Sequence, residues 1–474
     1  MSQRYLGTLK RTVAYAFAIA LVLFLAGAVG MGLRLGTATR ADTTPPPYTG
    51  ALPTPSTHNA LKPTAIVVAA NSGTEGSDFL APYAVLGTSG AFNLYAVAPE
   101  RRITHLFPGG TLVRGVDVVP HYSFAEYDTA IGSDPDLIVI PFMPYKQAPE
   151  YQTILKWIRA HAGPHTILLS ICAGAENLAD TGLLDGHAAT THHNSFALIA
   201  QQHPDVKLVH GVRYVEDGNI ISSAGITAGV DATLFALQRM LGHAAALDVA
   251  RQIDYPYTRV LSDPTYTPLA VGRATGPSLA TLFLSGYRLG TSHLGVALYD
   301  GMSELALASV VDTYPHQGGL TVDTIAPART VVLSQHGLAF IPRWSFADAP
   351  KLERIILPGR DSSVDTTAAF ERWAKARYQL SVERVHESGG YVYDSTFNDM
   401  ARRAGRVVTN EAIYFLEYPL GRVQIDAPLV SLDLSIRVVC FGLVGLGLAI
   451  AIDRRRAARK QRRQASMVQT VAAS

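Results

Sequence analysis

The chain has 474 residues, of which 48% are hydrophobic and 16% are charged, and its formal net charge is +2. This length leaves room for about two or three domains, and a composition this apolar excludes a largely disordered protein and indicates membrane segments. Much of the positive charge lies near the C-terminus, which excludes a basic nucleic-acid-binding domain, and two cysteines exclude a disulfide framework.

The chain begins with a short segment, residues 1–11, followed by a predicted membrane-spanning helix at residues 12–34. The uncharged run from Val13 to Leu33 is long enough, as a helix, to cross a hydrocarbon layer of about 30 Å. Basic residues before the run place the N-terminus in the cytoplasm by the positive-inside rule. A cleaved signal peptide is the alternative, with small residues at 38–41 near the cut, but the length of the run favours an uncleaved anchor.

Residues 35–63 are rich in proline and threonine, which predicts a semi-extended tether that does not pack. From residue 64 to residue 255, strands and helices alternate, a pattern typical of a parallel sheet covered by helices. Strands are expected at 65–69, 93–98, 137–140 and 166–169, helices at 78–86, 150–162 and 229–241, and an antiparallel turn at Asp217-Gly218.

The pentapeptide Ser170-Ile171-Cys172-Ala173-Gly174 joins a buried strand to a helix through a tight turn. Such a turn strains its central residue and needs small residues two positions to either side, a need that Ser170 and Gly174 meet. Cys172 would then point over the first amides of the helix, whose dipole favours a thiolate. We therefore predict a nucleophile elbow at Cys172; the alternative is a small buried hydrophobic residue, as free cysteines often are.

Several motifs at ordered spacing give this region a family resemblance. The elbow is followed by motifs at 181–186 and 189–192, and the run 223–231 leads into the last helix. Together they resemble the ThiJ/PfpI superfamily of class I glutamine amidotransferase-like domains, most of all the domain of AraC-type regulators and the isocyanide hydratases. The resemblance implies a flavodoxin-like three-layer sandwich, often dimeric, with a nucleophilic cysteine and an acid from the helix after the first strand, where Asp78 stands.

These residues define a hypothesis for catalysis. A thiolate at Cys172 would attack an electrophilic carbon, with the amide of Ala173 as one donor to the developing oxyanion. Asp78 beside the sulfur would be protonated and would donate to the thiolate; its alternative role is that of a helix N-cap. The resemblance places a histidine at His192, which is either a second acid or base or a residue that only bonds to backbone.

One stretch departs from the family. Where members of the superfamily place Pro-Gly-Gly to complete the oxyanion hole, this chain has Pro141-Phe142-Met143-Pro144. The side chains of Phe142 and Met143 either prevent the backbone conformation that glycine allows or shape a hydrophobic pocket over the cysteine.

A metal site is a further alternative for His187, His192 and His193 with Cys172. The histidines do not have the i, i+4 spacing of helical ligands, and His192 and His193 would point to opposite faces if they lie in a strand. We therefore predict no metal and no other cofactor.

An internal repeat predicts a second domain. The segment from Gly115 to Phe124 is echoed from Gly337 to Phe346, including a repeated Pro-x-aromatic-Ser-Phe. Two flanking segments also repeat: residues 95–99 resemble residues 322–327, and residues 137–141 resemble residues 354–358.

We expect a degenerate sandwich of the same architecture at residues 292–425, after a connector at residues 256–291. Its first strand would run from Leu294 to Leu298, and Glu304 would fall near the place of Asp78. This segment contains no cysteine, so thiol chemistry is excluded there.

Residues 435–453 form a second predicted membrane helix, followed by a basic tail at residues 454–474. The glycines of this helix suit close packing with the first span, which has its own Gly27, Gly30 and Gly32. The arginines after it are typical of a cytoplasmic stop-transfer segment. Both termini are therefore predicted inside a bacterial cytoplasmic membrane, with both sandwich domains on the extracytoplasmic side.

Two functional hypotheses follow. The first is a membrane-tethered cysteine hydrolase or hydratase acting on a small electrophile such as an amide, a carbonyl or an isocyanide. The second is a non-catalytic ligand-binding or redox-sensing membrane protein of the same fold, favoured by Phe142-Met143 and by the cysteine-free copy. Both expect a small molecule and the membrane as partners and leave a homodimer open. Nucleic acid is not expected, because no helix-turn-helix follows the first domain.

Overall fold

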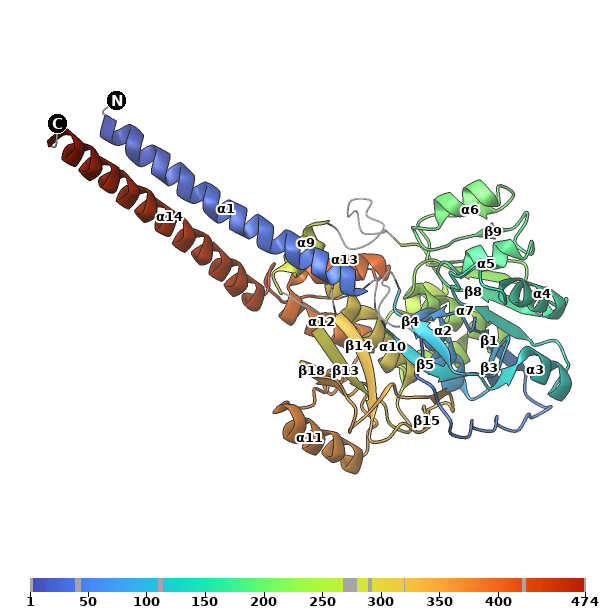
Figure 1. Ribbon diagram of the computed structural model, residues 1–474. Helices are drawn as coiled ribbons and strands as arrows, with labels where there is room; N and C mark the ends of the chain where they lie inside the picture. The colour runs from blue at the N-terminus through green and yellow to red at the C-terminus, as the bar shows by residue number, and fades with distance from the viewer. Residues whose placement is uncertain are drawn as a thin grey trace.

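The computed structural model describes residues 3–38, 44–109, 114–266, 279–288, 292–318, 320–419 and 423–472. The chain folds into two α/β halves that lie against each other, and a pair of long helices extends away from them (Figure 1). Residues 39–43 of the predicted tether and residues 267–278 and 289–291 of the predicted connector lie outside the described residues.

The first half is built on a seven-stranded sheet. Its strands are β1 (Thr64–Val68), β3 (Asn93–Ala98), β6 (Tyr122–Ser123), β7 (Leu137–Ile140), β8 (Ile167–Ser170), β11 (Tyr214–Asp217) and β12 (Ile220–Ser223). They lie in the order β11-β12-β8-β7-β1-β3-β6, and all neighbours pair in parallel except β11 with β12. The expected parallel sheet is therefore present, and its central strands are buried apolar runs because helices cover both faces.

Alternate residues of β1 face two separate cores. Ala65 and Val67 pack into a core with α2 (Gly76–Ser89), α7 (Ala228–Leu241) and α8 (His243–Gln252). Ile66 and Val68 pack into a second core with α3 (Phe124–Ala130), α4 (Tyr151–His161) and α5 (Gly174–Asp180). The result is the predicted flavodoxin-like sandwich of helices, sheet and helices. Smaller elements complete this half: β9 (Ala188–Ala189), α6 (Phe196–Gln202), β10 (Lys207–Leu208) and the 3₁₀ turn η1 (Thr258–Leu261).

The second half has a four-stranded parallel sheet. Its strands are β13 (Ser292–Ala297), β14 (Leu320–Ala326), β17 (Trp344–Ser345) and β18 (Arg354–Ile356), in the order β17-β14-β13-β18. This is the order of β6, β3, β1 and β7 in the first half, and α10 (Glu304–Thr313) follows β13 as α2 follows β1. The shared order supports an internal duplication, which stays a prediction.

The register of the two sheets relates the halves residue by residue. Val67 lies opposite Val139 on β7, and Val296 lies opposite Ile356 on β18, so Val67 and Val296 hold equivalent places. Counted from these two positions, Glu304 corresponds to Glu75 rather than to Asp78. By this count Glu304 lies three residues before the place of Asp78, close to where the repeat puts it.

The two halves join through the repeated segments themselves. A five-stranded sheet of β2 (Thr74–Glu75), β4 (Thr104–Phe107), β5 (Val116–Val119), β16 (Ala339–Phe340) and β15 (Val332–Leu333) crosses the junction. Within it β5 pairs antiparallel with β16, and Val118 lies opposite Phe340, its own counterpart in the repeat. The helices α2 and α10 also pack against each other. The antiparallel pairing of corresponding segments and the packing of α2 on α10 have the pattern of a local two-fold axis between the halves.

The end of the second half folds back onto the first. After the 3₁₀ turn η2 (Tyr314–Gln317) and helices α11 (Val364–Tyr378) and α12 (Val392–Ala404), helix α13 (Arg406–Phe415) runs to the first half. There the amide of Thr227 donates to the carbonyl of Leu416 at 3.1 Å, and Arg213 Nη1 donates to the carbonyl of Glu417. The sequence did not predict this contact.

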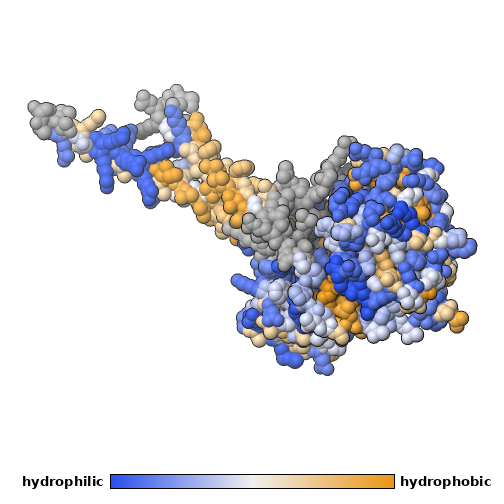
Figure 2. All heavy atoms as spheres, turned by 45° about the vertical axis from the view of Figure 1, so that its right-hand side comes forward, coloured by the Kyte–Doolittle hydropathy of each residue, from blue (hydrophilic) through white to orange (hydrophobic). Residues whose placement is uncertain are grey.

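The long helices α1 (Gln3–Ala38) and α14 (Leu432–Ala472) run side by side, and both chain ends lie at their far end (Figure 1). Within them, Gly7–Leu33 and Leu432–Gln469 are long and apolar enough to cross a membrane by length and composition. In Figure 2 the apolar band lies near the globular part and hydrophilic residues gather toward the far end. The α1 glycines do not face α14 as predicted: Gly27 and Gly30 lie against α9 (Leu279–Gly286).

Candidate active site

The predicted nucleophile elbow is present between β8 and α5. Cys172 has a φ of +56°, in the left-handed region that residues other than glycine rarely occupy. The turn requires Gly174, because a Cβ there would lie 2.1 Å from the carbonyl oxygen of Ile140. Two hydrogen bonds fix the turn: the Cys172 amide donates to Ser223 Oγ at 3.0 Å, and Thr191 Oγ1 donates to the Cys172 carbonyl at 3.1 Å.

Asp78 lies beside the thiol. The two side chains are close enough for each to affect the pKa of the other, and Asp78 Oδ2 accepts the amide of Phe142 at 3.2 Å. The helix-capping role weighed for Asp78 belongs instead to Glu75, which is the N-cap of α2 and accepts the Asp78 amide at 2.5 Å. The structure therefore brings the predicted acid and the predicted nucleophile together.

The surroundings of Cys172 favour the neutral thiol. Its side chain is buried, and this burial, followed by the nearby acidic residues, raises the pKa of the Cys172 thiol well above its ordinary value. The amide of Ala173 donates to the sulfur but does not outweigh burial, and α5 is only 7 residues long. The expected thiolate at neutral pH is therefore wrong for this closed arrangement. Burial also raises the pKa of Asp78 well above its usual range, in agreement with a protonated acid.

The predicted oxyanion and pocket residues divide between the two faces of the sheet. Ala173 directly follows Cys172, and its amide acts on the sulfur. The amide of Phe142 is directed to Asp78, and its side chain packs against the core that contains Cys172. Met143 is turned away, because its side chain lies in the core on the far face of the sheet. The interpretation that Met143 shapes a pocket over the cysteine is therefore wrong.

His192 lies in the loop after β9, with both ring nitrogens engaged. Nε2 lies 2.8 Å from the carbonyl oxygen of Phe415, which can only accept, so Nε2 carries the hydrogen; Nδ1 accepts the amide of Asn194 at 3.3 Å. Burial lowers the pKa of His192 to about 4, so the ring is neutral at physiological pH. A direct catalytic role for His192 stays a prediction, and it requires at least one of these bonds to break.

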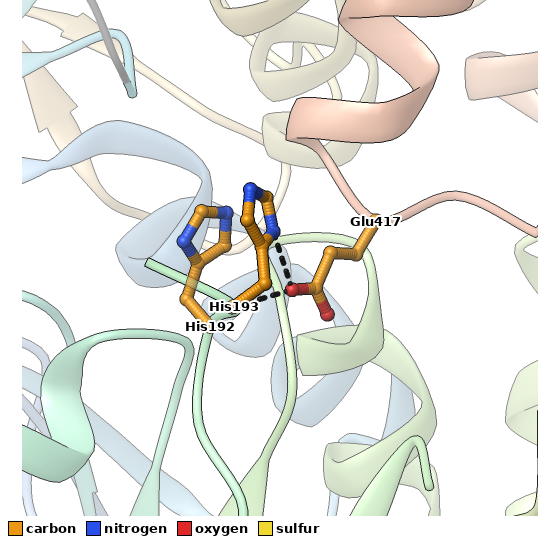
Figure 3. Close-up of side chains that lie close together, drawn as sticks. All are labelled: His192, His193 and Glu417. Carbon is orange, nitrogen blue, oxygen red and sulfur yellow. Dashed lines mark hydrogen bonds and ion pairs between the residues drawn. The ribbon is translucent and has the colours of Figure 1, made fainter. Parts of the chain in front are cut away.

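A carboxylate from the second half meets the histidine pair. Figure 3 shows Glu417 directed at His193, whose amide (2.7 Å) and ring Nδ1 (2.8 Å) both bond to Oε1. The other oxygen accepts the amide of Gly225 at 2.6 Å and the hydroxyl of Tyr266 at 3.4 Å. Burial by itself would raise the pKa of Glu417, but the hydrogen bonds from His193 outweigh it, and the pKa falls to about 2.

His192, His193 and Glu417 also have the composition of a metal site, with ligand atoms within 4.8 Å of one another. The two rings lie side by side, 4.1 Å apart, so the opposite orientation expected for a strand does not apply in this loop. His187 is elsewhere and pairs with Asp217. Because the Glu417 carboxylate already accepts four hydrogen bonds, the cluster is better explained as a contact between the halves than as a metal site.

A pocket of about 220 Å³ opens beside this contact rather than over the thiol. Its walls come from both halves, with Thr190, Thr191 and His193 from the first half and Tyr414 and Glu417 from the second among them. Thr191 lines the pocket and also donates to the Cys172 carbonyl, so this one residue separates the pocket from the elbow.

Sequence reasoning missed three buried acids around the elbow: Glu75, Asp312 and Glu417. Glu75 had a local signal, since it lies three residues before Asp78 at the start of the same helix. Asp312 and Glu417 come from the second half of the chain and have no local signal. Their roles depend on how the two halves pack.

Comparison with known protein families finds a match within the first half of the chain. Residues 64–239 match the DJ-1/PfpI family. The chain is 35% identical to isonitrile hydratase of Pseudomonas putida over 107 residues, which is 22% of this chain and 45% of that protein. It is 30% identical to the HTH-type transcriptional regulator CdhR of Pseudomonas aeruginosa over 99 residues, 21% of this chain and 29% of that protein. The chain therefore spans less than half of each relative.

Solved structures match the chain over 40% of its length. Drosophila melanogaster DJ-1beta matches with 19% identity and a TM-score of 0.35, over 40% of this chain and 97% of that structure. An AraC family transcriptional regulator from Pseudomonas putida matches with 18% identity and a TM-score of 0.33, over 40% of this chain and 99% of that structure.

Proposed function

We propose, from the premise that residues 64–239 form a DJ-1/PfpI family domain, that this protein is a membrane-tethered enzyme whose Cys172 adds to a small electrophile. Isonitrile hydratase among its relatives points to a hydratase or hydrolase reaction at a carbon–nitrogen or carbonyl bond. The observation that carries the proposal is the placement of the buried Asp78 carboxyl beside the buried Cys172 thiol, which sits at a strained turn. A strained backbone kept at such a position is typical of functional sites.

A neutral thiol and a neutral carboxylic acid can react in a dry site without separating charge. As the sulfur attacks the electrophilic carbon, the thiol proton passes to one oxygen of Asp78, and the proton on the other oxygen passes to the substrate. The S–H bond and one O–H bond break, while a C–S bond, a new O–H bond and one bond from substrate to hydrogen form. Water then adds to the carbon, and the sulfur leaves and recovers its proton through Asp78.

For an isonitrile, the first step gives a thioimidate and the second a formamide. The amide of Ala173 is placed to stabilise charge that develops beside the sulfur. Because Cys172 is almost fully buried, only a small substrate can reach it without a movement of the second half.

The two apolar helices support the membrane part of the proposal. Their ends lie together, so a membrane crossed by both would have both termini on one side. Arg454, Arg455, Arg456 and Arg459 follow the apolar part of α14, and basic residues of this kind stay in the cytoplasm. We place both halves on the extracytoplasmic face.

The test is turnover by the purified full-length chain in detergent, with a small alkyl isonitrile, a small primary amide and a small aldehyde as probes. We expect one of these to be converted, with loss of about a hundredfold or more in Cys172→Ser and in Asp78→Asn. Asp399→Asn, in the second half, is the matched control and should retain activity. Equal turnover in wild type and Cys172→Ser, or no conversion of any probe, would overturn the proposal.

The alternative is a binding protein that performs no chemistry. It is favoured by the pocket between the halves, whose walls do not include Cys172. Redox sensing at Cys172 is less well supported, because oxidation needs an accessible thiolate and this thiol is buried with a raised pKa. Saturable binding of a small molecule that is lost in Tyr266→Ala and retained in Cys172→Ser would support this alternative.

A further inference from the structure

Three carboxyl side chains lie buried together behind Cys172. Glu75 and Asp78 come from the start of α2, and Asp312 comes from α10 in the other half. All three are at most 1% exposed. Since α2 and α10 pack against each other at the junction, Asp312 is the contribution of the cysteine-free half to this group.

Backbone amides fix one oxygen of each carboxyl. The amide of Gly109 donates to Asp312 Oδ1 at 2.6 Å, the amide of Phe142 donates to Asp78 Oδ2 at 3.2 Å, and the Asp78 amide donates to Glu75 Oε2 at 2.5 Å. The other three oxygens, Glu75 Oε1, Asp78 Oδ1 and Asp312 Oδ2, are buried, and none has a donor among the described residues. Oxygens in this situation can be satisfied by protons that the carboxyls share among themselves.

The three carboxyls favour their protonated forms. Burial raises the pKa of all three groups, and each pKa is also affected by a neighbouring carboxyl. Gly109 places Asp312 next to Glu75: its amide donates to Asp312 Oδ1, and a Cβ on Gly109 would lie 3.3 Å from Glu75 Oε1. Asp312 and Glu75 therefore lie side by side, and Glu75 in turn accepts the Asp78 amide.

We propose that Asp312 is a positioning residue of the Cys172 site: it shares a proton with Glu75 and thereby holds Asp78 in the protonated, hydrogen-bonded arrangement that faces the sulfur. This inference rests on the proposed function and deepens it, because it gives the second half a part in the site. The local two-fold axis explains how this happens. Asp312 corresponds to Tyr83, whose hydroxyl reaches across the junction to the carbonyl of His336 at 3.1 Å, beside Glu304.

The test follows the protonation of Asp78 directly and needs no substrate. In the full-length chain, infrared spectroscopy resolves the carbonyl stretch of protonated carboxylic acids, and the difference between wild type and Asp78→Asn assigns the band of Asp78. We expect this band to titrate at a pH about one unit lower in Asp312→Asn, because the repulsion that keeps Asp78 protonated is lost. Asp399→Asn, a buried acid of the same half that pairs with Arg354, should leave the midpoint unchanged.

An unchanged midpoint in Asp312→Asn, or an equal shift in Asp399→Asn, would overturn the inference. If Asp312→Asn does not fold, Asp312→Ser removes the same charge with a smaller side chain and should lower the midpoint in the same way. Turnover is measured separately on the same samples. A chain that shows the shift but converts no probe would refute the proposed function and leave the inference standing.

Discussion

Glu417 is a buried carboxylate that ties the end of the second half to the first. We expect Glu417→Gln to lower the free energy of unfolding by about 2 kcal/mol near neutral pH, because hydrogen bonds to a charged group are lost. The pKa of Glu417 is lowered from 4.5 to about 2 in the folded chain. Its contribution to the free energy of unfolding is therefore fully present above pH 4.5 and is lost as the pH falls toward 2. Thermal unfolding of the full-length chain against pH checks this.

The matched control is Glu353→Gln, an exposed glutamate of the same half, which should change stability little at any pH. A destabilisation by Glu417→Gln that stays constant from neutral pH to strongly acidic pH would show that the carboxylate charge is not what holds the two halves together.

We expect Asp312 to have the opposite effect on the pH dependence of stability. Its pKa is raised in the folded chain, so the folded state is penalised as the pH rises above the ordinary value of 3.8. We expect Asp312→Asn to raise the free energy of unfolding by about 1 kcal/mol or more at mildly alkaline pH, with a smaller gain in acid. Melting temperatures at both ends of this range measure it. A loss of stability in alkali would mean that Asp312 is ionised and stabilised by a neighbour.

At the residue scale, the sequence predicts those features of the site that short local motifs determine. Cys172 and Asp78 were found because a strand–turn–helix motif and the start of a helix have local signatures, and the two side chains do meet. The protonation of the thiol was predicted wrongly, because it depends on burial and on nearby acids, among them Glu417 from the end of the chain. Met143 was misplaced because a slip of one residue along the backbone moves a side chain to the other face of the sheet.

At the element scale, the pairing of β5 with β16 is supported by a buried ion pair between the halves. Arg343 Nε lies 2.8 Å from Asp117 Oδ2, and both side chains are buried. We expect Arg343→Met to destabilise the chain by about 3–5 kcal/mol, because it removes the arginine partner of the buried Asp117 carboxylate and leaves that carboxylate with His105 Nδ1, at 3.0 Å. Chemical denaturation of the full-length chain measures the loss.

The double variant Asp117→Asn with Arg343→Met is the control for that prediction. It removes both charges, so it should be clearly more stable than Arg343→Met alone. If the single and double variants unfold at the same denaturant concentration, the ion pair has no part in holding the halves together.

The expected strands of the first half are present because each is an apolar run that must be buried on both faces, a property that is visible in the sequence. The helices α12 and α13 were not predicted. Their buried faces are completed by the first half and by α10, so no pattern within residues 368–420 shows what they pack against.

At the scale of the whole molecule, the pair of long helices predicts a topology. If α1 and α14 both cross the membrane, reporters fused to either terminus should lie on the cytoplasmic side, and a reporter inserted at the exposed Gly90 turn should lie outside. Green fluorescent protein and alkaline phosphatase fusions, which are active on opposite sides of a bacterial membrane, distinguish these positions. Termini on opposite sides would contradict the two-span arrangement.

The local two-fold axis links this architecture to the site. The second half packs against the first along the junction and supplies Asp312 and Glu417 to the surroundings of Cys172.

The most direct measurement is mass spectrometry of the full-length chain after rapid acid quenching during reaction with a small alkyl isonitrile. The account predicts an adduct with the mass of the substrate on the peptide that contains Cys172, absent from the Cys440 peptide and strongly reduced in Asp78→Asn. Product formation without any adduct on Cys172, or equal labelling of Cys172 and Cys440, would contradict it.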